Sequence, residues 1–306
     1  MTDRQTRISP EAQALYDDLK KAGIQVPDHD NIRQYRHALI DGSSQDIERE
    51  IAEFEGDIQD LEIATVNCRQ ITPSGWDSER GACIQYAYGG GYVSGSVWED
   101  QIITLPLAKL SGARIVMVDY RLSPEHPYPA AQQDMQQVYQ SLIKTYGSER
   151  LIVSGESAGG HQALGVMQYA LTQGLALPAC AILFSPWVDL TNQGDSHQFN
   201  DARDPTLNNA WVDSAAEMHA AGADLSDPGI SPINGNLSGL PPCLITTGSR
   251  DLLLSQCLRL ADGLHTAGVP CDLRVWEAMW HVFEFYPIPE ARQSLAQVAD
   301  FIHAHI

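Results

Sequence analysis

The sequence predicts an α/β protein in which a mostly parallel sheet is covered by helices on both faces. Two observations support this prediction. After residue 60, short apolar runs alternate with longer amphipathic segments, and 43% of the 306 residues are hydrophobic, enough to build a substantial core. Strands that alternate with helices are typical of parallel sheets with helices on both sides.

The expected elements divide the chain into a core and a helical cap. Strands are expected over residues 61–68, 82–88, 114–119, 151–154, 179–185, 243–247 and 272–276. Helices of the core are expected over residues 100–110, 130–146, 157–173, 255–267 and 289–304. Residues 1–55 have the pattern of helices instead, with Ser9 as the N-cap of the first helix and a second helix over 46–54. Residues 192–225 interrupt the alternation with a polar stretch and a helix over 209–221, so we expect a cap segment (1–55) and a core (56–306) with a cap insertion at about 192–225.

The charge of the chain limits its partners. Its formal net charge is −20, so it lacks the basic surface that binding to nucleic acid or to an anionic membrane requires. No run of 18 or more apolar residues is present, and the first residues have no apolar stretch of the kind found in secretory signals. We therefore expect a cytoplasmic protein, and the negative charge disfavours a strongly anionic substrate.

The cysteines do not predict a metal site or a disulfide framework. None of the six forms a C-x-x-C pair, and several lie in apolar runs that resemble strands. Buried, reduced thiols are the expectation for Cys68, Cys83, Cys180, Cys243, Cys257 and Cys271. No metal and no cofactor are expected.

Ser157 is the predicted nucleophile. It lies in Gly155-Glu156-Ser157-Ala158-Gly159, which fits G-x-S-x-G, between an apolar strand and the start of an Ala/Gly-rich helix. A serine on such a strand-to-helix turn is exposed at the end of the sheet. The helix N-terminus then points its positive dipole end at developing negative charge, as acyl transfer requires.

A serine hydroxyl needs a base, and the base needs an orienting acid. His281 is the predicted base because it follows strand 272–276 in a short loop, whereas the later histidines lie in helices: His265, His303 and His305. Asp251 is the predicted acid because it follows the strand at 243–247. The alternatives are that Asp251 only caps the next helix and that Glu277 is the acid. The chain order serine, acid, histidine is that of G-x-S-x-G hydrolases.

A glycine run supplies candidate donors for an oxyanion. Gly89-Gly90-Gly91-Tyr92 follows the strand expected at 82–88, and successive glycines let the backbone direct its N–H groups toward a substrate. A phosphate-binding function is excluded, because neither a G-K-[ST] ending nor a G-x-G-x-x-G fingerprint is present.

These motifs together resemble the hormone-sensitive lipase-like branch of the α/β-hydrolases. That family joins a His-Gly-Gly-Gly loop to a Gly-Asp-Ser-Ala-Gly-Gly elbow, and this chain has Tyr-Gly-Gly-Gly at 88–91 and Gly-Glu-Ser-Ala-Gly-Gly at 155–160. The segments DYRLSPEHPYPA at 119–130, SPWVDL at 185–190 and LPP at 240–242 are also similar to the family. The resemblance covers about residues 60–306.

The resemblance implies the α/β-hydrolase fold and a role for each motif residue. Ser157, Asp251 and His281 would form a catalytic triad, and the N–H groups of Gly90, Gly91 and Ala158 would form the oxyanion hole. Two positions depart from the family: Tyr88 replaces its histidine and Glu156 replaces its aspartate. Together with Gly89, these two residues would support the loop and the elbow.

The resulting hypothesis is a serine carboxylesterase that hydrolyses short- to medium-chain esters through an acyl-enzyme, without a cofactor and, by analogy with the family, as a homodimer. A lactonase or a deacetylase of a small metabolite would use the same chemistry. A ligand-binding protein that has lost catalysis is the alternative from another class. Four aromatic residues are candidates for lining the substrate pocket, although core packing is the other interpretation: Tyr92, Trp187, Trp211 and Trp280.

Overall fold

The computed structural model describes residues 8–306, and residues 1–7, the beginning of the predicted cap segment, lie outside it. Within the described residues, eight strands form one sheet in the order β1-β2-β4-β3-β5-β6-β7-β8. Strands β3 to β8 run parallel, whereas β2 is antiparallel to both β1 and β4. The strands are β1 (Gly56–Ile63), β2 (Val66–Pro73), β3 (Cys83–Ala87), β4 (Arg114–Val118), β5 (Leu151–Glu156), β6 (Cys180–Phe184), β7 (Cys243–Gly248) and β8 (Cys271–Trp276).

The predicted strand at 61–68 is wrong, because this region forms a hairpin. Strands β1 and β2 pair over their whole length and are joined by Ala64 and Thr65, both with positive φ. Strand β1 is largely exposed and polar, so it lacks the apolar run that marks a buried strand. Its turn also lacks the Asn-Gly or Gly residues that usually announce a tight hairpin.

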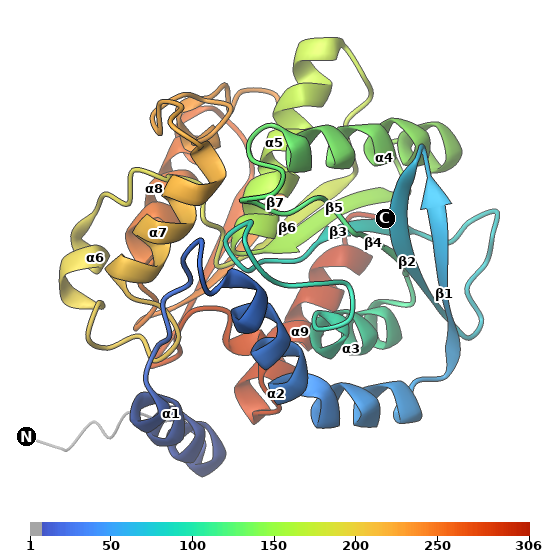
Figure 1. Ribbon diagram of the computed structural model, residues 1–306. Coiled ribbons are helices and arrows are strands. Elements are labelled where there is room, and N and C mark those ends of the chain that lie inside the picture. The colour runs from blue at the N-terminus through green and yellow to red at the C-terminus, as the bar shows by residue number, and fades with distance from the viewer. Residues whose placement is uncertain (1–7) are drawn as a thin grey trace, which may run out of the picture.

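Helices cover both faces of the sheet, as the alternating pattern predicts (Figure 1). Helices α3 (Gln101–Ser111) and α9 (Pro289–His303) pack together on one face, and α4 (Ala130–Tyr146) and α5 (Ala158–Gln173) pack together on the other. Helix α8 (Leu254–Thr266) packs against β7 and β8. This is the α/β-hydrolase architecture, and it brings the carboxyl ends of the parallel strands to one edge of the sheet.

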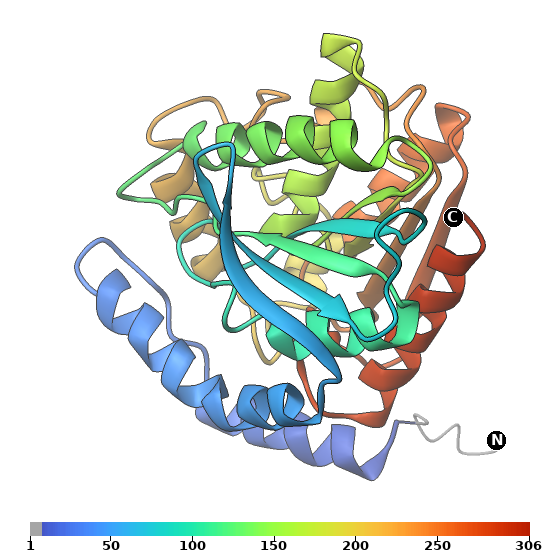
Figure 2. The same ribbon diagram turned by 90° about the vertical axis from the view of Figure 1, so that its right-hand side faces the viewer.

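Helices from two distant parts of the chain lie beside that core. Helix α1 (Pro10–Ala22) begins after the N-cap Ser9, whose Oγ accepts from the N–H of Ala12 at 3.1 Å. Helix α2 (Ile32–Glu53) begins 14 residues before the helix expected over 46–54. Figure 2 shows α1 and α2 running along one side of the core. The region 192–225 holds α6 (Asp195–Phe199) and α7 (Asn209–Ala220).

The two helical regions contact one another directly. Trp211 of α7 donates from Nε1 to the hydroxyl of Tyr35 in α2 at 2.9 Å. Ser214 of α7 donates from Oγ to the carbonyl of Pro27 at 2.6 Å. The cap segment and the insertion are therefore joined by hydrogen bonds, even though about 180 residues separate them along the chain.

None of the helices in the described part of the chain combines the length and the apolar character that crossing a bilayer requires.

All six cysteines are free thiols, and five of them are buried. Burial raises the pKa of Cys83 and of Cys180 to about 12, so these thiols are protonated at neutral pH.

Candidate active site

Ser157 lies on a sharp turn between β5 and α5. Its backbone has φ 53° and ψ −119°, an unfavourable conformation for a residue with a side chain. The turn brings backbone so close that a Cβ on Gly155 would lie 2.4 Å from the backbone of Gly159, and one on Gly159 would lie 1.9 Å from the carbonyl oxygen of Ala87. The two glycines of the motif are therefore required by close packing.

The structure brings Ser157, His281 and Asp251 together in a hydrogen-bonded chain. Ser157 Oγ lies 3.0 Å from His281 Nε2, and His281 Nδ1 lies 3.1 Å from Asp251 Oδ1. Asp251 also accepts hydrogen bonds from the hydroxyl of Thr247 at 2.9 Å and from the N–H of Leu253 at 2.8 Å. All three side chains of this chain are buried. The arrangement is that of a nucleophile, a base and an orienting acid.

Opposite charges in this group shift the pKa of His281 and the pKa of Asp251 in opposite directions. Burial alone would raise the pKa of Asp251, but the neighbouring His281 lowers it below its ordinary value. Burial alone would lower the pKa of His281, but Asp251 and Asp204 raise it above the usual value. The site can therefore stabilise an imidazolium, the state that His281 would reach after taking a proton from Ser157.

Asp204 is part of this group, although the sequence analysis did not single it out. It is fully buried, and its Oδ2 accepts the N–H of Leu252 at 2.9 Å and the N–H of His281 at 3.2 Å. Its Oδ1 accepts from Thr206 and Leu207. Asp204 thus ties the loop of the histidine to the loop of the acid. Burial and the neighbouring Asp251 raise its pKa to about 6.

The other candidates for the base and the acid are not part of this hydrogen-bonded chain. His265 is near the carbonyl of Cys271, His303 near that of Ser111, and His305 near that of Phe301. Glu277 is exposed and makes no side-chain hydrogen bond among residues 8–306. The alternative that Asp251 only caps α8 is wrong, because Leu253 is the N-cap of that helix and no side chain caps it; Asp251 Oδ1 accepts the N–H of Leu253 and also faces His281.

The glycine loop lies beside Ser157. Gly90 and Gly91 have φ values of 86° and 61°, which glycine adopts without strain. Within the described part of the chain, no acceptor receives the N–H of Gly90, Gly91 or Ala158. By contrast, the N–H of Gly89 donates to Glu156 Oε1. Glu156 therefore links the loop to the elbow, whereas the N–H groups of Gly90, Gly91 and Ala158 have no acceptor among the described residues.

Tyr88 is held by a reciprocal pair of hydrogen bonds. Its hydroxyl donates to the carbonyl of Tyr120 at 3.0 Å, and the hydroxyl of Tyr120 donates to the carbonyl of Tyr88 at 2.7 Å. The two rings stack with their centroids 4.3 Å apart. The phenol at position 88 thus fixes the start of the glycine loop from a buried position.

A cavity of about 180 Å³ opens beside Ser157 and His281. Trp211, one of the four aromatic candidates, lines it, and Gly90 and Gly89 form part of its wall. Three further aromatic residues line it that the sequence analysis did not propose: Tyr35, Phe285 and Tyr286. They come from α2 and from the loop after His281, so only the fold brings them together.

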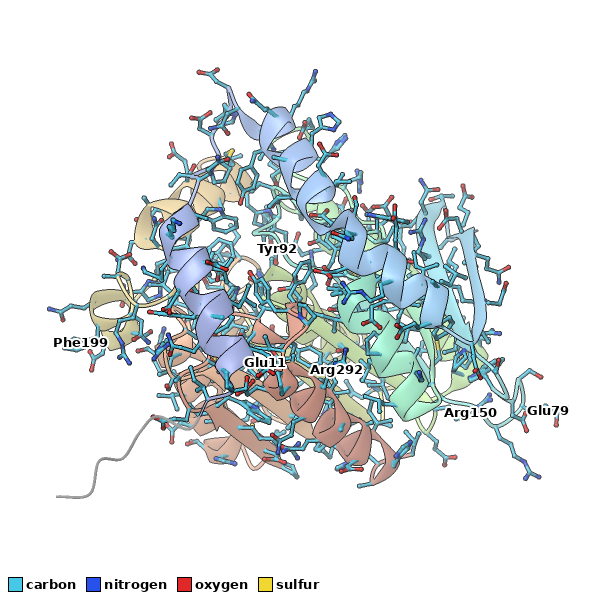
Figure 3. All side chains as sticks on the ribbon, turned by 90° about the horizontal axis from the view of Figure 1, so that it is seen from below. Glu11, Glu79, Tyr92, Arg150, Phe199 and Arg292 are labelled. Carbon is cyan, nitrogen blue, oxygen red and sulfur yellow. The ribbon has the colours of Figure 1, made fainter. Side chains whose placement is uncertain are left out.

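The other three aromatic candidates are core residues that do not line this cavity. Tyr92 stacks on His219 with a centroid distance of 3.7 Å and bonds to His161, and Figure 3 shows it in the interior of the molecule. Trp187 is buried and donates from Nε1 to Asn192 at 2.8 Å. Trp280 packs in a buried cluster with Met279 and Phe283. The other interpretation, core packing, holds for these three.

Comparison with known proteins identifies the family. Residues 84–285 match a family described as having the alpha/beta hydrolase fold. This chain is a member of the α/β-hydrolase family. An acetyl-hydrolase of Streptomyces hygroscopicus is 34% identical over 225 residues, which cover 72% of this chain and 75% of the relative. An esterase of Acinetobacter venetianus is 33% identical and covers 71% and 73%.

Solved structures place this α/β-hydrolase in the hormone-sensitive lipase-like branch. A hormone-sensitive lipase from a metagenome library is 34% identical with a TM-score of 0.87, covering 98% of this chain and 99% of the other. EstE5 soaked with p-nitrophenyl butyrate is 31% identical with a TM-score of 0.86, covering 97% and 99%. The α/β-hydrolase described here is accordingly a carboxylic ester hydrolase.

Proposed function

We propose that this α/β-hydrolase cleaves short- to medium-chain carboxylic esters through Ser157, His281 and Asp251. The observation that carries the proposal is the hydrogen-bonded chain from Ser157 Oγ to His281 (3.0 Å) and on to Asp251 (3.1 Å). The small cavity beside Ser157 favours short acyl groups. The name of the Streptomyces relative, an acetyl-hydrolase, points in the same direction.

The reaction has two halves. Ser157 Oγ attacks the ester carbonyl carbon while its proton passes to His281 Nε2, and the resulting oxyanion is bound by the N–H groups of Gly90, Gly91 and Ala158. The tetrahedral intermediate collapses when the imidazolium protonates the alcohol oxygen, which leaves an acyl group on Ser157. Water then attacks the acyl carbon, gives its proton to His281, and the acid is released as Ser157 regains a proton.

A fluorophosphonate probe tests the proposal and its alternative from another class. We expect the native protein to gain one probe mass on Ser157 and to hydrolyse p-nitrophenyl acetate and butyrate. The Ser157→Ala variant should bind no probe and lose turnover by at least about 10⁴-fold. Failure of the folded native protein to label would instead favour a ligand-binding protein that has lost catalysis.

A further inference from the structure

Three carboxyl groups line the cavity next to Ser157. Glu99 and Asp100 lie immediately before α3, and Glu156 directly precedes the nucleophile. Their exposed fractions are only 6%, 2% and 6%, so all three are more than nine-tenths buried. A buried carboxylate is costly unless a positive charge or several hydrogen bonds compensate it.

The protein gives these carboxyls few partners, all of them neutral. Ser96 donates to Glu99 Oε2 at 2.8 Å, Tyr86 donates to Asp100 Oδ2 at 2.9 Å, and the N–H of Gly89 donates to Glu156. The second oxygen of each carboxyl receives no hydrogen bond from residues 8–306, and no lysine or arginine lines the cavity.

Asp204 and Glu284 are also buried with neutral donors only, whereas two other buried carboxylates have a cation beside them. Asp134 pairs with Arg121 at 2.8 Å, and Asp189 pairs with Arg259 at 2.6 Å. The three carboxyls of the cavity have no such cation beside them, because no lysine or arginine lines it. Burial raises the pKa of Asp100 to about 8, and burial also raises the pKa of Glu99 and of Glu156.

The rest of the wall is aromatic. Tyr35, Trp211, Phe285 and Tyr286 all line the cavity, and the hydrogen bond from Trp211 Nε1 to the hydroxyl of Tyr35 fixes two of the rings against each other. The faces of such rings attract an organic cation. Among the described residues, no group of three or more acidic, histidine or cysteine side chains is arranged to hold a metal ion, so a metal is not the charge that fits here.

We infer that the cavity selects esters that carry a positively charged nitrogen, an ammonium group held between the aromatic rings and the carboxyls of Glu99, Asp100 and Glu156. The inference rests on the proposed function, since it names the substrate class of the same site. The formal net charge of −20 adds a long-range attraction for cations.

Choline and 3,3-dimethylbutan-1-ol test the inference, because they have nearly the same shape and differ in the positive charge. Each is measured as a competitive inhibitor of p-nitrophenyl acetate hydrolysis by the full chain. We expect the inhibition constant of choline to be lower than that of the neutral alcohol by about tenfold. Glu99→Gln or Asp100→Asn should reduce this ratio by about threefold or more.

A matched control removes one charge far from the cavity. Glu79 is exposed and lies at the edge of the molecule, far from Tyr92 beside the glycine loop (Figure 3). Glu79→Gln should keep the native ratio. If this variant lowered the ratio as much as Glu99→Gln does, the preference would come from net charge alone and the inference would be overturned.

Two outcomes with the native protein and its cavity variants also overturn the inference. One is equal inhibition by choline and the neutral alcohol, and the other is a preference for choline that is unchanged in both Glu99→Gln and Asp100→Asn. Calorimetric titration of the two ligands needs no turnover, so it tests the inference even if the proposed hydrolysis fails. Conversely, hydrolysis of p-nitrophenyl acetate without any preference for choline would leave the proposed function intact.

Discussion

The backbone N–H of His281 donates to Asp204 Oδ2 at 3.2 Å, so the base of the proposed triad is held by a carboxylate from the cap insertion. The same oxygen accepts the N–H of Leu252, one residue after Asp251. One buried side chain therefore sets the position of both loops, and its negative charge contributes to the raised pKa of His281.

Asp204→Asn should alter both stability and the pH dependence of catalysis. The aspartate has two acceptor oxygens, whereas the amide of asparagine has one acceptor oxygen and one NH2 donor. At least one buried N–H therefore loses its partner. We expect the free energy of unfolding to fall by about 1–3 kcal/mol. Without the negative charge, the pKa of His281 should fall, which shifts the acid limb of kcat/KM to lower pH.

Urea unfolding and a pH–rate profile measure the two effects. Asp18→Asn is the control, because Asp18 is exposed and has no side-chain hydrogen bond among the described residues. An acid limb that stays at the native pH in a folded Asp204→Asn protein would show that the carboxylate holds the two loops in position without raising the pKa of His281.

The pH profile of the native protein follows from the state of His281. Only the neutral imidazole can take the proton of Ser157, and the pKa of His281 is raised above 6.5. We expect kcat/KM for p-nitrophenyl butyrate to rise with pH through a pKa above 6.5 and to fall about tenfold per pH unit below it. An acid limb centred below pH 6 would contradict the charge arrangement described for Asp251 and Asp204.

Tyr88→Phe tests whether the phenol positions the glycine loop. The ring stack on Tyr120 is kept, but the hydrogen bond to the Tyr120 carbonyl is lost, so we expect a loss of about 0.5–1.5 kcal/mol in unfolding free energy. If the loop shifts, kcat should fall by a few-fold, up to about tenfold, because oxyanion stabilisation depends on donor geometry.

Tyr139→Phe is the matched control for Tyr88. Its hydroxyl donates to the carbonyl of Ala176 at 2.7 Å on the face of the sheet that carries α4, outside the site. We expect a similar loss of stability with native kcat. Equal kcat in the two variants would mean that Tyr88 stabilises the fold without positioning the oxyanion donors.

Trp211→Ala should change the preference for acyl-chain length. The indole lines the cavity, and a Cβ on Gly91 would lie only 2.6 Å from its ring, so it packs tightly beside the glycine loop. Its removal enlarges the cavity. In a series of p-nitrophenyl esters from acetate to decanoate, the optimum should move to longer chains by two or more carbons.

Trp76→Ala is the comparison for Trp211. The guanidinium of Arg114 lies over the ring of Trp76, and Trp76 donates from Nε1 to the carbonyl of Ala82 at 2.9 Å. Trp76 does not line the cavity. The Trp76→Ala variant should be less stable than the native protein and should keep the native preference for acyl-chain length. An unchanged chain-length preference in the Trp211→Ala variant would show that another part of the cavity wall limits the length of the acyl chain.

The sequence predicted the parts of the site that are local and missed those that depend on the fold. Ser157 and Asp251 follow the buried strands β5 and β7, and His281 follows the edge strand β8. The chain order is set by the topology, so their meeting could be expected. Asp204 could not be found in this way, because it comes from an irregular cap segment and contacts residues about 50 and 80 positions later.

The same limit explains the errors in the elements. Helix α2 begins 14 residues before the helix expected over 46–54 and continues through Asp41-Gly42-Ser43-Ser44, a composition that is typical of turns. The helix packs on α3, a tertiary contact that the local sequence does not contain. Among the aromatic candidates, Trp211 lines the cavity and Trp280 does not. Which of two buried tryptophans lines a cavity depends on how the cap packs, a property that no local pattern contains.

Glu284 should make stability depend on pH. It is fully buried, accepts hydrogen bonds from the hydroxyls of Thr246 and Ser294, both at 2.8 Å, and its second oxygen has no donor in the described part of the chain. Burial raises the pKa of Glu284 to about 7. Because the folded state binds the proton more tightly than the unfolded chain, its contribution is complete below about pH 4.5 and is lost as pH rises through 7.

Glu284→Gln isolates this contribution. The amide keeps an acceptor for both hydroxyls and cannot ionise, while the other buried carboxyls are unchanged. Between pH 5 and 8 the free energy of unfolding of the native protein should fall by on the order of 3 kcal/mol more than that of the variant. Glu79→Gln, which removes an exposed charge, should keep the native slope in urea unfolding. Parallel slopes for the native protein and Glu284→Gln would mean that Glu284 is ionised in the folded state at neutral pH, with a counter-charge or water compensating its second oxygen.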